Sequence, residues 1–367
     1  MSKVRLGDVA IEYKETCKGS KEGYPIVGLE HLIPEDINLT QWNESSENTF
    51  TKMFRKGQVL FGRRRAYLKK AAVAPFDGIC SGDITVIEAK PDRILPELLP
   101  FIIQNDDLFD FAVGKSAGSL SPRVKWQHLS NYEFELHDMD KQRELARLLW
   151  AMDATKQAYK KLLAKTDELV KSQFIEMFGN PLTNDRGWEF KLLSDVTKFV
   201  LGSTPKSSEP AYWDGNIKWI TPAELEDGTF EIYDSVRHIT EEGVKSAGLK
   251  PFPAGTVIFS TRAPIGKTAI AGCEMYCNQG FKNFICGDML NPVYLYSLLR
   301  IYKEYFVGLG TGATFKELSK ARLEKIAIAI PPKSLQDWFE CFYRQSDKSK
   351  FDVDLLVSNQ NYLLKSL

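Results

Sequence analysis

The chain has 367 residues, of which 43% are hydrophobic and 12% aromatic, and 48 basic residues balance 48 acidic ones to a formal net charge of zero. These values exclude a disordered chain and a uniformly basic one, and the length suits two domains of roughly 150 residues. No apolar run approaches the roughly twenty residues of a membrane span, and the N-terminus lacks a signal-peptide core. The six cysteines are unevenly spaced, so we expect reduced thiols, a cytoplasmic location and no membrane partner.

The two halves of the chain repeat one pattern. Residues 54–82 lie over residues 252–280 at a constant offset of 198, and a second block follows at an offset of 194. Identical pairs include Phe61/Phe259, Arg64/Arg262, Lys69/Lys267, Gly114/Gly308, Gln142/Gln336 and Asp153/Asp347. A tandem duplication of this length predicts two similar modules and two similar binding events.

Each half begins with short β-rich runs separated by Gly and Pro. The predicted strands are 59–61, 71–74, 84–88 and 132–136 in the first half, and 257–259, 268–271, 283–286 and 326–330 in the second. Helical segments are predicted over 96–111 and 292–306, between the third and fourth strands. This order predicts an α+β fold with two pseudo-symmetric mixed α/β globular domains.

A long helix is predicted after each globular part. Residues 140–178 contain neither Pro nor Gly, and their apolar residues recur at helical steps of three, four and seven. Gly179 and Pro181 end this helix, which would span roughly 55 Å at ~1.5 Å per residue. The second copy begins near Ser334, and a polar run over 345–350 interrupts its apolar stripe.

Helices of this length do not bury an apolar stripe alone. We therefore expect the two to pack as an antiparallel coiled-coil spacer between the domains. The residues expected to meet along one seam are Leu148, Leu162, Leu356 and Leu363. The alternative is that each helix lies on its own globular domain. The predicted organisation is a globular domain over 1–137, a central helix over 138–181, a second globular domain over 182–331 and a C-terminal helix over 332–367.

Catalytic and metal-binding motifs are not found in the sequence. Gly266-Lys267-Thr268 ends like a phosphate-binding loop, but residue 261 is Thr where that loop needs Gly. The four His show no metal-ligand spacing. No Gly-x-Gly-x-x-Gly and no Asn-Pro-Pro-aromatic loop is present. We therefore expect no catalytic residue and no metal ligand in this chain.

Basic and polar residues instead gather on loops. The loop after the first predicted strand carries five cations within eight residues, namely Arg63, Arg64, Arg65, Lys69 and Lys70, together with Tyr67. Arginine is a planar bidentate donor to phosphates and to guanine edges, so this loop suits a nucleic acid. The alternative is a solvated hairpin tip. The recurrence of Arg262 and Lys267 in the second half favours a DNA contact in both halves.

Two further loop regions carry candidate DNA contacts. Residues 114–125 and 308–320 combine Gly, small hydroxyl residues and cations, and residues 202–206 form a third candidate site in the second half. The candidates from these regions and their neighbours are Ser119, Ser121, Arg123, Lys125, Ser203, Thr204, Lys206, Thr261, Gln279, Lys282, Thr311, Thr314 and Lys316.

Several motifs carry a resemblance to a known family. They are Gly202-Ser203-Thr204-Pro205, Tyr212-Trp213-x-Gly215, Trp219-Ile220-Thr221, Gly255-x-Val257-Ile258-Phe259-Ser260-x-Arg262 and Gly310-x-Gly312-Ala313-Thr314. Together with the duplicated plan, they resemble the target recognition domains of the specificity subunit of type I restriction-modification systems, over essentially the whole chain. The first half departs from the pattern, because it lacks the Thr-Pro motif and carries an arginine triplet.

The resemblance implies a non-catalytic subunit in which each target recognition domain reads one half of a bipartite site in double-stranded DNA. The long helices would set the spacing and dock two methyltransferase subunits, and restriction/translocase subunits would join them. No cofactor is expected on this chain, because S-adenosylmethionine, ATP and Mg are expected on the partner subunits. Without partners, the helices would favour self-association. Two alternatives stay open, a stand-alone DNA modification or restriction enzyme and a coiled-coil scaffold that binds protein.

Overall fold

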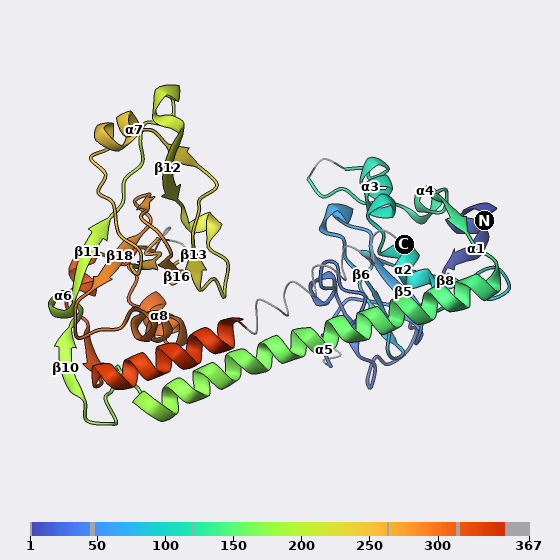
Figure 1. Ribbon diagram of the computed structural model, residues 1–367. Helices are drawn as coiled ribbons and strands as arrows, with labels where there is room; N and C mark the ends of the chain where they lie inside the picture. The colour runs from blue at the N-terminus through green and yellow to red at the C-terminus, as the bar shows by residue number, and fades with distance from the viewer. Residues whose placement is uncertain (1, 45–47, 119, 263, 313–315, 349–367) are drawn as a thin grey trace. The chain divides into compact units, whose positions relative to one another are not determined.

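The computed structural model describes residues 2–44, 48–118, 120–262, 264–312 and 316–348 (Figure 1). A first compact unit holds Met1–Tyr159, and a second begins at Lys160. The long helix α5 (Met139–Phe178) is uninterrupted and contributes residues to both units. None of the described helices is both long and apolar enough to cross a membrane.

The first unit is built around a four-stranded antiparallel sheet of order β2-β8-β5-β6. Its strands are Ala10–Glu12 (β2), Ile84–Ala89 (β8), Val59–Gly62 (β5) and Ala71–Val73 (β6). All four residues of β5 are buried, because β5 is a central strand with both faces covered. This environment explains why its sequence is a continuous apolar run rather than an alternating one.

Smaller sheets and short helices complete the first unit. The sheets are β3-β7-β4 (Ile26–Val27, Gly78–Cys80 and Lys52–Phe54) and β1-β9 (Ser2–Arg5 and Glu133–Leu136). The helices are α1 (Leu6–Val9), η1 (Leu29–His31), η2 (Ala66–Leu68), α2 (Leu99–Ile103), α3 (Asp106–Gly114) and α4 (Trp126–Leu129).

The predicted helix over 96–111 is divided in the structure. The side chain of Asn105 accepts a hydrogen bond from the Asp107 backbone N–H at 2.8 Å and so caps the start of α3. An N-cap residue has extended rather than helical backbone angles, and therefore it separates α2 from α3. Asp106 and Asp107 in the first turn add favourable charge at the helix N-terminus.

The second unit contains a five-stranded sheet, a three-stranded sheet and a two-stranded sheet. The five-stranded sheet has the order β11-β18-β15-β16-β13 (Thr197–Leu201, Lys282–Cys286, Val257–Phe259, Thr268–Ala271 and Glu231–Ile232). The three-stranded sheet has the order β14-β12-β17 (His238–Ile239, Trp213–Ile220 and Tyr276–Cys277). The two-stranded sheet pairs β10 with β19 (Glu189–Leu192 and Ala327–Ile330). The helices are α6 (Leu193–Val196), η3 (Pro210–Tyr212), η4 (Pro222–Glu224), α7 (Glu241–Ser246), α8 (Pro292–Ile301), α9 (Lys303–Gly308), α10 (Lys320–Leu323) and a helix over 333–348.

The two units share a strand order. The series β11-β18-β15-β16 has the order of β2-β8-β5-β6, and the pair β10-β19 has its counterpart in β1-β9. The second unit adds β13, which pairs with β16 in parallel. The strands predicted in both halves are confirmed within one or two residues at their ends, and the predicted α+β class is confirmed.

The two ends of α5 are buried in different cores. Ala146 and Leu149 pack in a core of the first unit, whereas Phe174 and Phe178 pack in a core of the second. Leu148 and Leu162 are 48% and 51% exposed. Their predicted seam partners, Leu356 and Leu363, lie outside the described residues, so that seam stays a prediction. α5 thus lies on a globular core at each of its ends.

Within the second unit, α5 runs antiparallel to the helix over 333–348 (Figure 1). The rings of Phe174 and Phe178 each contact the ring of Phe339, with centroids 5.4 Å apart. Tyr294 of α8 stacks on Phe174 at 5.4 Å and closes the aromatic cluster. α5 then ends at Gly179, whose φ of 69° is in the left-handed region that favours glycine.

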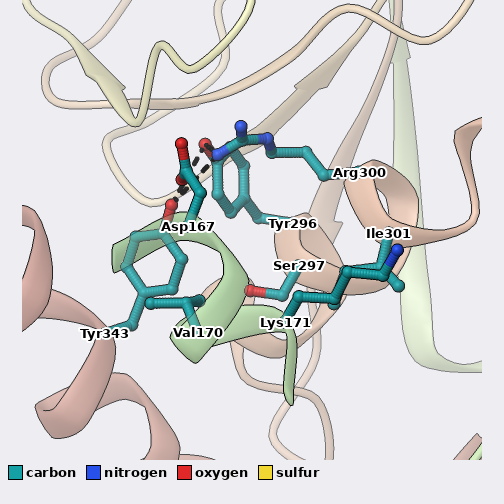
Figure 2. Close-up of a pocket in the computed structure, with 8 residues that line it drawn as sticks. All are labelled: Asp167, Val170, Lys171, Tyr296, Ser297, Arg300, Ile301 and Tyr343. Carbon is teal, nitrogen blue, oxygen red and sulfur yellow. Dashed lines mark hydrogen bonds between the residues drawn. The ribbon is translucent and has the colours of Figure 1, made fainter. Parts of the chain in front are cut away.

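A cavity of about 270 Å³ lies where α5, α8 and the helix over 333–348 meet (Figure 2). Asp167 of α5 is part of its wall. Arg300 donates to the hydroxyls of Tyr296 and Tyr343 at 2.9 and 3.2 Å. Burial raises the pKa of Tyr296 well above its usual value, so its hydroxyl stays protonated and donates to the Thr229 carbonyl at 2.9 Å. This network joins α8 to the helix over 333–348, and the charge of Asp167 on α5 acts on Arg300, so we assign the cavity to packing.

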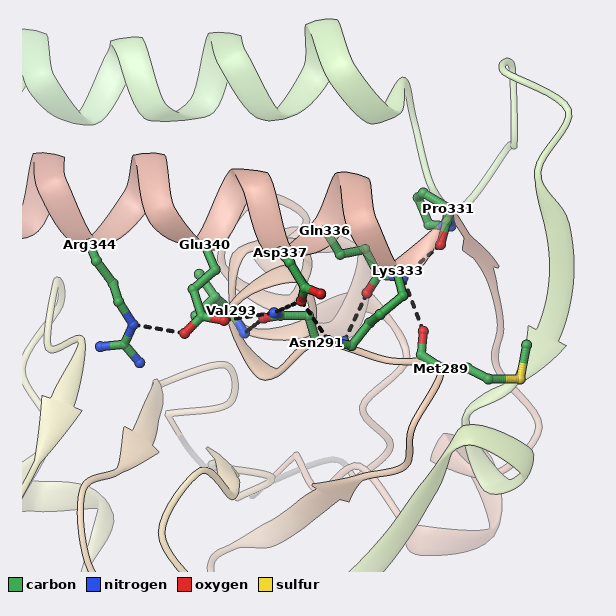
Figure 3. Close-up of polar contacts among 9 residues, drawn as sticks. All are labelled: Met289, Asn291, Val293, Pro331, Lys333, Gln336, Asp337, Glu340 and Arg344. Atoms are coloured by element: carbon green, nitrogen blue, oxygen red, sulfur yellow. Dashed lines mark hydrogen bonds and ion pairs between the residues drawn. The ribbon is translucent and has the colours of Figure 1, made fainter.

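A buried glutamine fixes the helix over 333–348 to the second unit (Figure 3). The Oε1 atom of Gln336 accepts from the Asn291 backbone N–H at 2.8 Å. Its Nε2 atom donates to the carbonyls of Pro331 at 2.7 Å and Met289 at 3.0 Å. The Asn291 side chain adds bonds of 2.7 Å to Asp337 and Glu340 of the same helix.

The corresponding glutamine of the first half does the same for α5. Gln142 is 2% exposed; its Oε1 accepts from the Leu95 backbone N–H at 2.8 Å, and its Nε2 donates to the His137 carbonyl at 2.7 Å. His137 corresponds to Pro331 at the offset of 194. Each long helix is therefore attached to its own unit by an equivalent side chain.

Replacing either Gln142 or Gln336 with Ala leaves a buried backbone N–H and at least one buried carbonyl without a partner. We expect each change to lower the free energy of unfolding by about 1–3 kcal/mol. Urea unfolding followed by circular dichroism measures this loss. Gln41→Ala is the control, because Gln41 is exposed. A loss below about 0.5 kcal/mol in both variants, the range of ordinary surface substitutions, would contradict the assignment.

Candidate nucleic-acid interface

Three segments of the first unit meet beyond the end of β5, and we call residues 62–70, 81–83 and 114–125 loop cluster 1. The Arg63 backbone N–H donates to the Asp83 carbonyl at 3.0 Å, and the Arg63 carbonyl accepts from the Val124 N–H at 2.9 Å. The Arg65 N–H donates to the Pro122 carbonyl at 2.8 Å. These bonds bring together the two regions of the first half that carry predicted DNA contacts.

One carboxylate lies among the cations of loop cluster 1. Asp83 Oδ1 is 2.6 Å from Arg123 Nε, and its Oδ2 is 3.3 Å from Arg64 Nη1. Arg64 also donates from Nε to the Ser121 hydroxyl. The hydrogen bond from Arg123, and then the charges of Arg123 and Arg64, hold the pKa of Asp83 below its usual value. Two of the predicted DNA-binding arginines are therefore engaged with a carboxylate.

Other predicted residues of loop cluster 1 differ in their engagement. Lys69 Nζ is 2.6 Å from Asp106, and Lys70 donates to a backbone carbonyl at 2.8 Å. Arg65 and Lys125 are exposed, with no ion pair or side-chain hydrogen bond seen among the described residues, and Tyr67 is 55% exposed. Arg63 is partly buried. Ser119 lies outside the described residues.

The second unit builds the same arrangement beyond β15, and we call residues 260–267, 278–282 and 308–320 loop cluster 2. The Thr261 N–H donates to the Gly280 carbonyl at 2.8 Å, and the Thr261 carbonyl accepts from the Leu318 N–H at 2.8 Å. These are the counterparts of the bonds that Arg63 makes in loop cluster 1. Thr261 is fully buried, so the structure places this predicted contact in the framework of the cluster.

A carboxylate also lies among the cations of loop cluster 2. Glu317 Oε1 is 3.1 Å from Lys282 Nζ, and its Oε2 is 3.1 Å from Arg262 Nε. Lys282 is only 7% exposed and also donates to the Thr261 hydroxyl at 2.9 Å. Burial by itself raises the pKa of Glu317, but Lys282 and Arg262 together outweigh burial and lower it. Thr311 and Lys316 are exposed in this cluster, and Thr314 lies outside the described residues.

The segment 202–206 is fixed by two tryptophans. Trp219 Nε1 donates to the Ser203 carbonyl at 3.0 Å, and Trp213 Nε1 donates to the Lys206 carbonyl at 3.3 Å. The Thr204 hydroxyl bonds the side chain of Gln279. Gly202 is required here, because a Cβ atom would lie 2.1 Å from a backbone oxygen. The Lys206 side chain is exposed.

The structure joins this segment to loop cluster 2. Arg262, Lys267 and Gln279 line one open hollow of about 370 Å³, whose wall includes Thr221 and Pro222. Lys267 donates to the Pro222 carbonyl at 3.0 Å. Predicted residues separated by up to 75 positions in the chain, Thr204 and Gln279, are thus brought into one surface region.

Several charged residues in or near the candidate interface escaped the sequence analysis. Asp83 and Glu317 were not predicted, because a carboxylate near cations gives no motif in sequence. Arg237 was also missed; its guanidinium lies 3.6 Å above the centre of the Trp213 ring, and its side chain is exposed. No group of three or more His, Cys, Asp or Glu able to hold a metal is found in the part of the chain that the structure describes.

The two loop clusters carry cations at equivalent places, and comparison with known proteins shows what this chain is similar to. A family model for the type I restriction modification DNA specificity domain matches residues 185–337. The type I restriction enzyme MjaIX specificity subunit of Methanocaldococcus jannaschii is 39% identical over 150 residues, which are 40% of this chain and 34% of that protein. The chain thus spans about a third of the length of this relative.

Two further comparisons extend over most of the chain. The putative type I restriction enzyme MjaX specificity subunit of the same organism is 19% identical over 346 residues, covering 86% of this chain and 79% of that protein. A solved structure concerned with complex assembly and conformational transition of the type I R-M system is 22% identical, covers 100% of this chain and 95% of that chain, and has a TM-score of 0.56. At this identity the structure shows the shared fold alone.

Residues 185–337 therefore match the DNA specificity domain of type I restriction-modification systems, in agreement with the sequence resemblance. The expectation of a non-catalytic subunit agrees with the names of these relatives, which are called specificity subunits.

The ion contacts of Asp83 predict a pH dependence. Because its folded-state pKa is lowered, its ion pairs are fully present above the unfolded-state pKa, about 3.9, and are lost as the pH falls through the lower folded-state value. We expect NMR titration of the carboxyl carbon to give a midpoint below ~3.9 and Arg123→Ala to raise it. Glu317 is the internal control, because it lies in the other unit and should not respond. An ordinary midpoint for Asp83 in the unaltered chain would contradict the geometry.

Proposed function

We propose that the chain reads a bipartite site in double-stranded DNA, and that each unit contacts one half-site through its loop cluster. One observation carries the proposal. Residues 185–337 match a DNA specificity domain, and the first unit builds the same hydrogen-bonded loop framework as the matched region. Two equivalent frameworks in one chain suit two separate half-sites.

The side chains exposed on the clusters suit the two kinds of DNA contact. Arg65, Lys125 and Lys206 are exposed cations that would neutralise phosphates and set the register on the duplex. Gln279, which lines the hollow of loop cluster 2, has the amide that pairs with the N6 and N7 atoms of adenine in the major groove. A local cluster is sufficient for this role, so a net charge of zero is no obstacle.

The long helices would set the spacing between the half-sites and dock partners. α5 has 40 residues and a length of roughly 60 Å, which exceeds the ~34–36 Å between half-sites one DNA turn apart. Leu148, Leu162 and Leu169 are 48%, 51% and 54% exposed on it. Exposed apolar side chains on a helix suit protein contacts. We assign them to docking of two methyltransferase subunits, and to self-association when these are absent.

Catalysis and its cofactors would reside on the partners in this arrangement. S-adenosylmethionine would be bound by the methyltransferase subunits, and ATP and Mg by the restriction/translocase subunits that join them. A methylation assay tests this division. The purified chain alone should transfer no methyl group, and addition of methyltransferase subunits should give methylation at a two-part sequence. Methylation by the chain alone would instead identify a stand-alone modification enzyme.

The exposed cations of loop cluster 1 give a first prediction for DNA binding. Arg65→Ala combined with Lys125→Ala removes two phosphate contacts, so the salt dependence of binding, measured with methyltransferase subunits present, should fall by about two in slope. Selection from a random DNA pool should show relaxed preference in one half-site and an unchanged second half-site.

The matched control removes two cations elsewhere in the same unit. Lys56 and Arg93 are exposed, and Lys56 lies in the turn that precedes β5, at the strand end opposite to loop cluster 1. Lys56→Ala with Arg93→Ala should leave the slope and both half-sites unchanged. An equal fall of the salt-dependence slope in the two double variants would mean that the total charge of the unit, and not the loop cluster, determines binding.

The spacer role of α5 gives a second prediction. Duplicating residues 160–166 adds two helical turns, or ~10 Å, within a stretch whose side chains are mostly exposed. Because DNA rises ~3.4 Å per base pair, the tolerated spacer should change by about three base pairs and the half-site sequences should stay the same. Mapping of methylated adenines measures both. A changed half-site sequence with the original spacer would contradict the spacer role.

A further inference from the structure

The two loop clusters contain opposite charges at one equivalent position. Arg123 and Glu317 correspond at the offset of 194 residues. Arg123 exchanges backbone hydrogen bonds of 3.0 and 3.1 Å with Ala117, and Glu317 exchanges bonds of 2.9 and 3.0 Å with Thr311. The backbone is therefore the same at this position, while the side-chain charge is reversed.

Each of these two residues meets a residue of opposite charge, although the equivalent of Asp83 in the second unit is Gly280 and not Lys282. In loop cluster 1 the cation Arg123 meets the anion Asp83, whereas in loop cluster 2 the anion Glu317 meets the cation Lys282. The third member is the repeated arginine, Arg64 or Arg262, which bonds the carboxylate in both clusters. We call these two sets of one carboxylate and two cations ion triads. Glu317 uses one oxygen for each cation, whereas Asp83 Oδ2 accepts from both Arg64 and Arg123.

The ion triads connect the segments that make up each cluster. In loop cluster 1, Arg64 follows β5, Asp83 precedes β8, and Arg123 belongs to the segment 114–125. The described residues of that segment form no helix or strand between α3 and α4. Its backbone bonds, the buried side chain of Val124 and the triad therefore fix its position. Holding a loop in its bound geometry before binding lowers the entropic cost of binding.

Resting on the proposed function, we infer that Asp83 and Glu317 are positioning residues for DNA recognition. Each places a DNA-facing loop by holding its ion triad together. Arg123 and Lys282 then act through the triad, and direct DNA contact is left to exposed side chains such as Lys125. Recognition requires opposite charges at positions 83 and 123. Either of the two residues can be the cation.

Charge exchange tests this inference, because loop cluster 2 contains an ion triad in which the residue equivalent to Arg123 is the anion. Arg123→Glu and Asp83→Lys should each weaken binding of the complex with methyltransferase subunits by about tenfold, the loss of one charge-assisted contact. The double variant, which has the polarity of loop cluster 2, should recover to within about threefold of the unaltered complex. A direct phosphate contact by Arg123 would not be restored by Asp83→Lys, and failure of the double variant to recover would overturn the inference.

Lys125→Glu is the matched control for the rescue. It makes the same charge change in the same loop, at an exposed residue for which no ion pair is seen among the described residues. It should weaken binding, and Asp83→Lys should not restore it. Asp83→Asn should relax one half-site only, and Glu317→Gln the other only. Rescue of Lys125→Glu by Asp83→Lys would show a general charge effect and would overturn the inference.

A measurement without DNA separates this inference from the proposed function. Amide hydrogen exchange at Ala117, Arg123 and Val124, measured on the full chain, should become faster in both single variants and return to the original rate in the double variant. Melting temperatures should change little, because partly exposed ion pairs contribute little to global stability. Loss of DNA binding by the unaltered complex would reject the proposed function alone, whereas unchanged exchange in the single variants would reject the ion triads.

Discussion

In each unit, one backbone hydrogen bond joins the residue that follows a central strand to a distant loop. The positions of the other residues of the candidate interface depend on this bond. Val124 donates to Arg63 beyond β5, and Leu318 donates to Thr261 beyond β15. Buried backbone groups need partners, and in each unit this bond gives an irregular loop a fixed place at the sheet end. The carboxylates, the arginines and the exposed cations then lie together as a consequence. The chain topology, rather than any one side-chain contact, therefore brings the residues of each cluster together.

The sequence predicted the parts of the fold that depend on local pattern. β5 and β15 were predicted because central strands buried on both faces are continuous apolar runs. α5 was predicted because its apolar residues keep helical spacing over 40 residues. The division at Asn105 was missed, since a single capping side chain outweighed the helical periodicity around it.

The candidate site was predicted only in part, for a different reason. Cations could be recognised as a group, but whether each one faces a carboxylate depends on residues 19 or 40 positions away, as for Arg64 and Arg123 with Asp83. Sheet topology creates these pairs, and periodicity contains no information about them. The equivalence of Arg64 and Arg262 was visible in sequence, whereas the exchange of charge between Arg123 and Glu317 acquires meaning only from their shared backbone bonds.

The ion triads also explain how a chain of zero net charge presents cationic loops. Under the proposed function, a carboxylate within a loop cluster opposes DNA binding electrostatically, so its presence in both halves needs a compensating benefit. Each carboxylate neutralises one of two framework cations and leaves each triad with one net positive charge. The carboxylate thereby lowers the affinity for DNA but fixes the geometry of the loop. That exchange favours discrimination between sequences, because a rigid loop cannot adjust to a wrong base as readily as a mobile one.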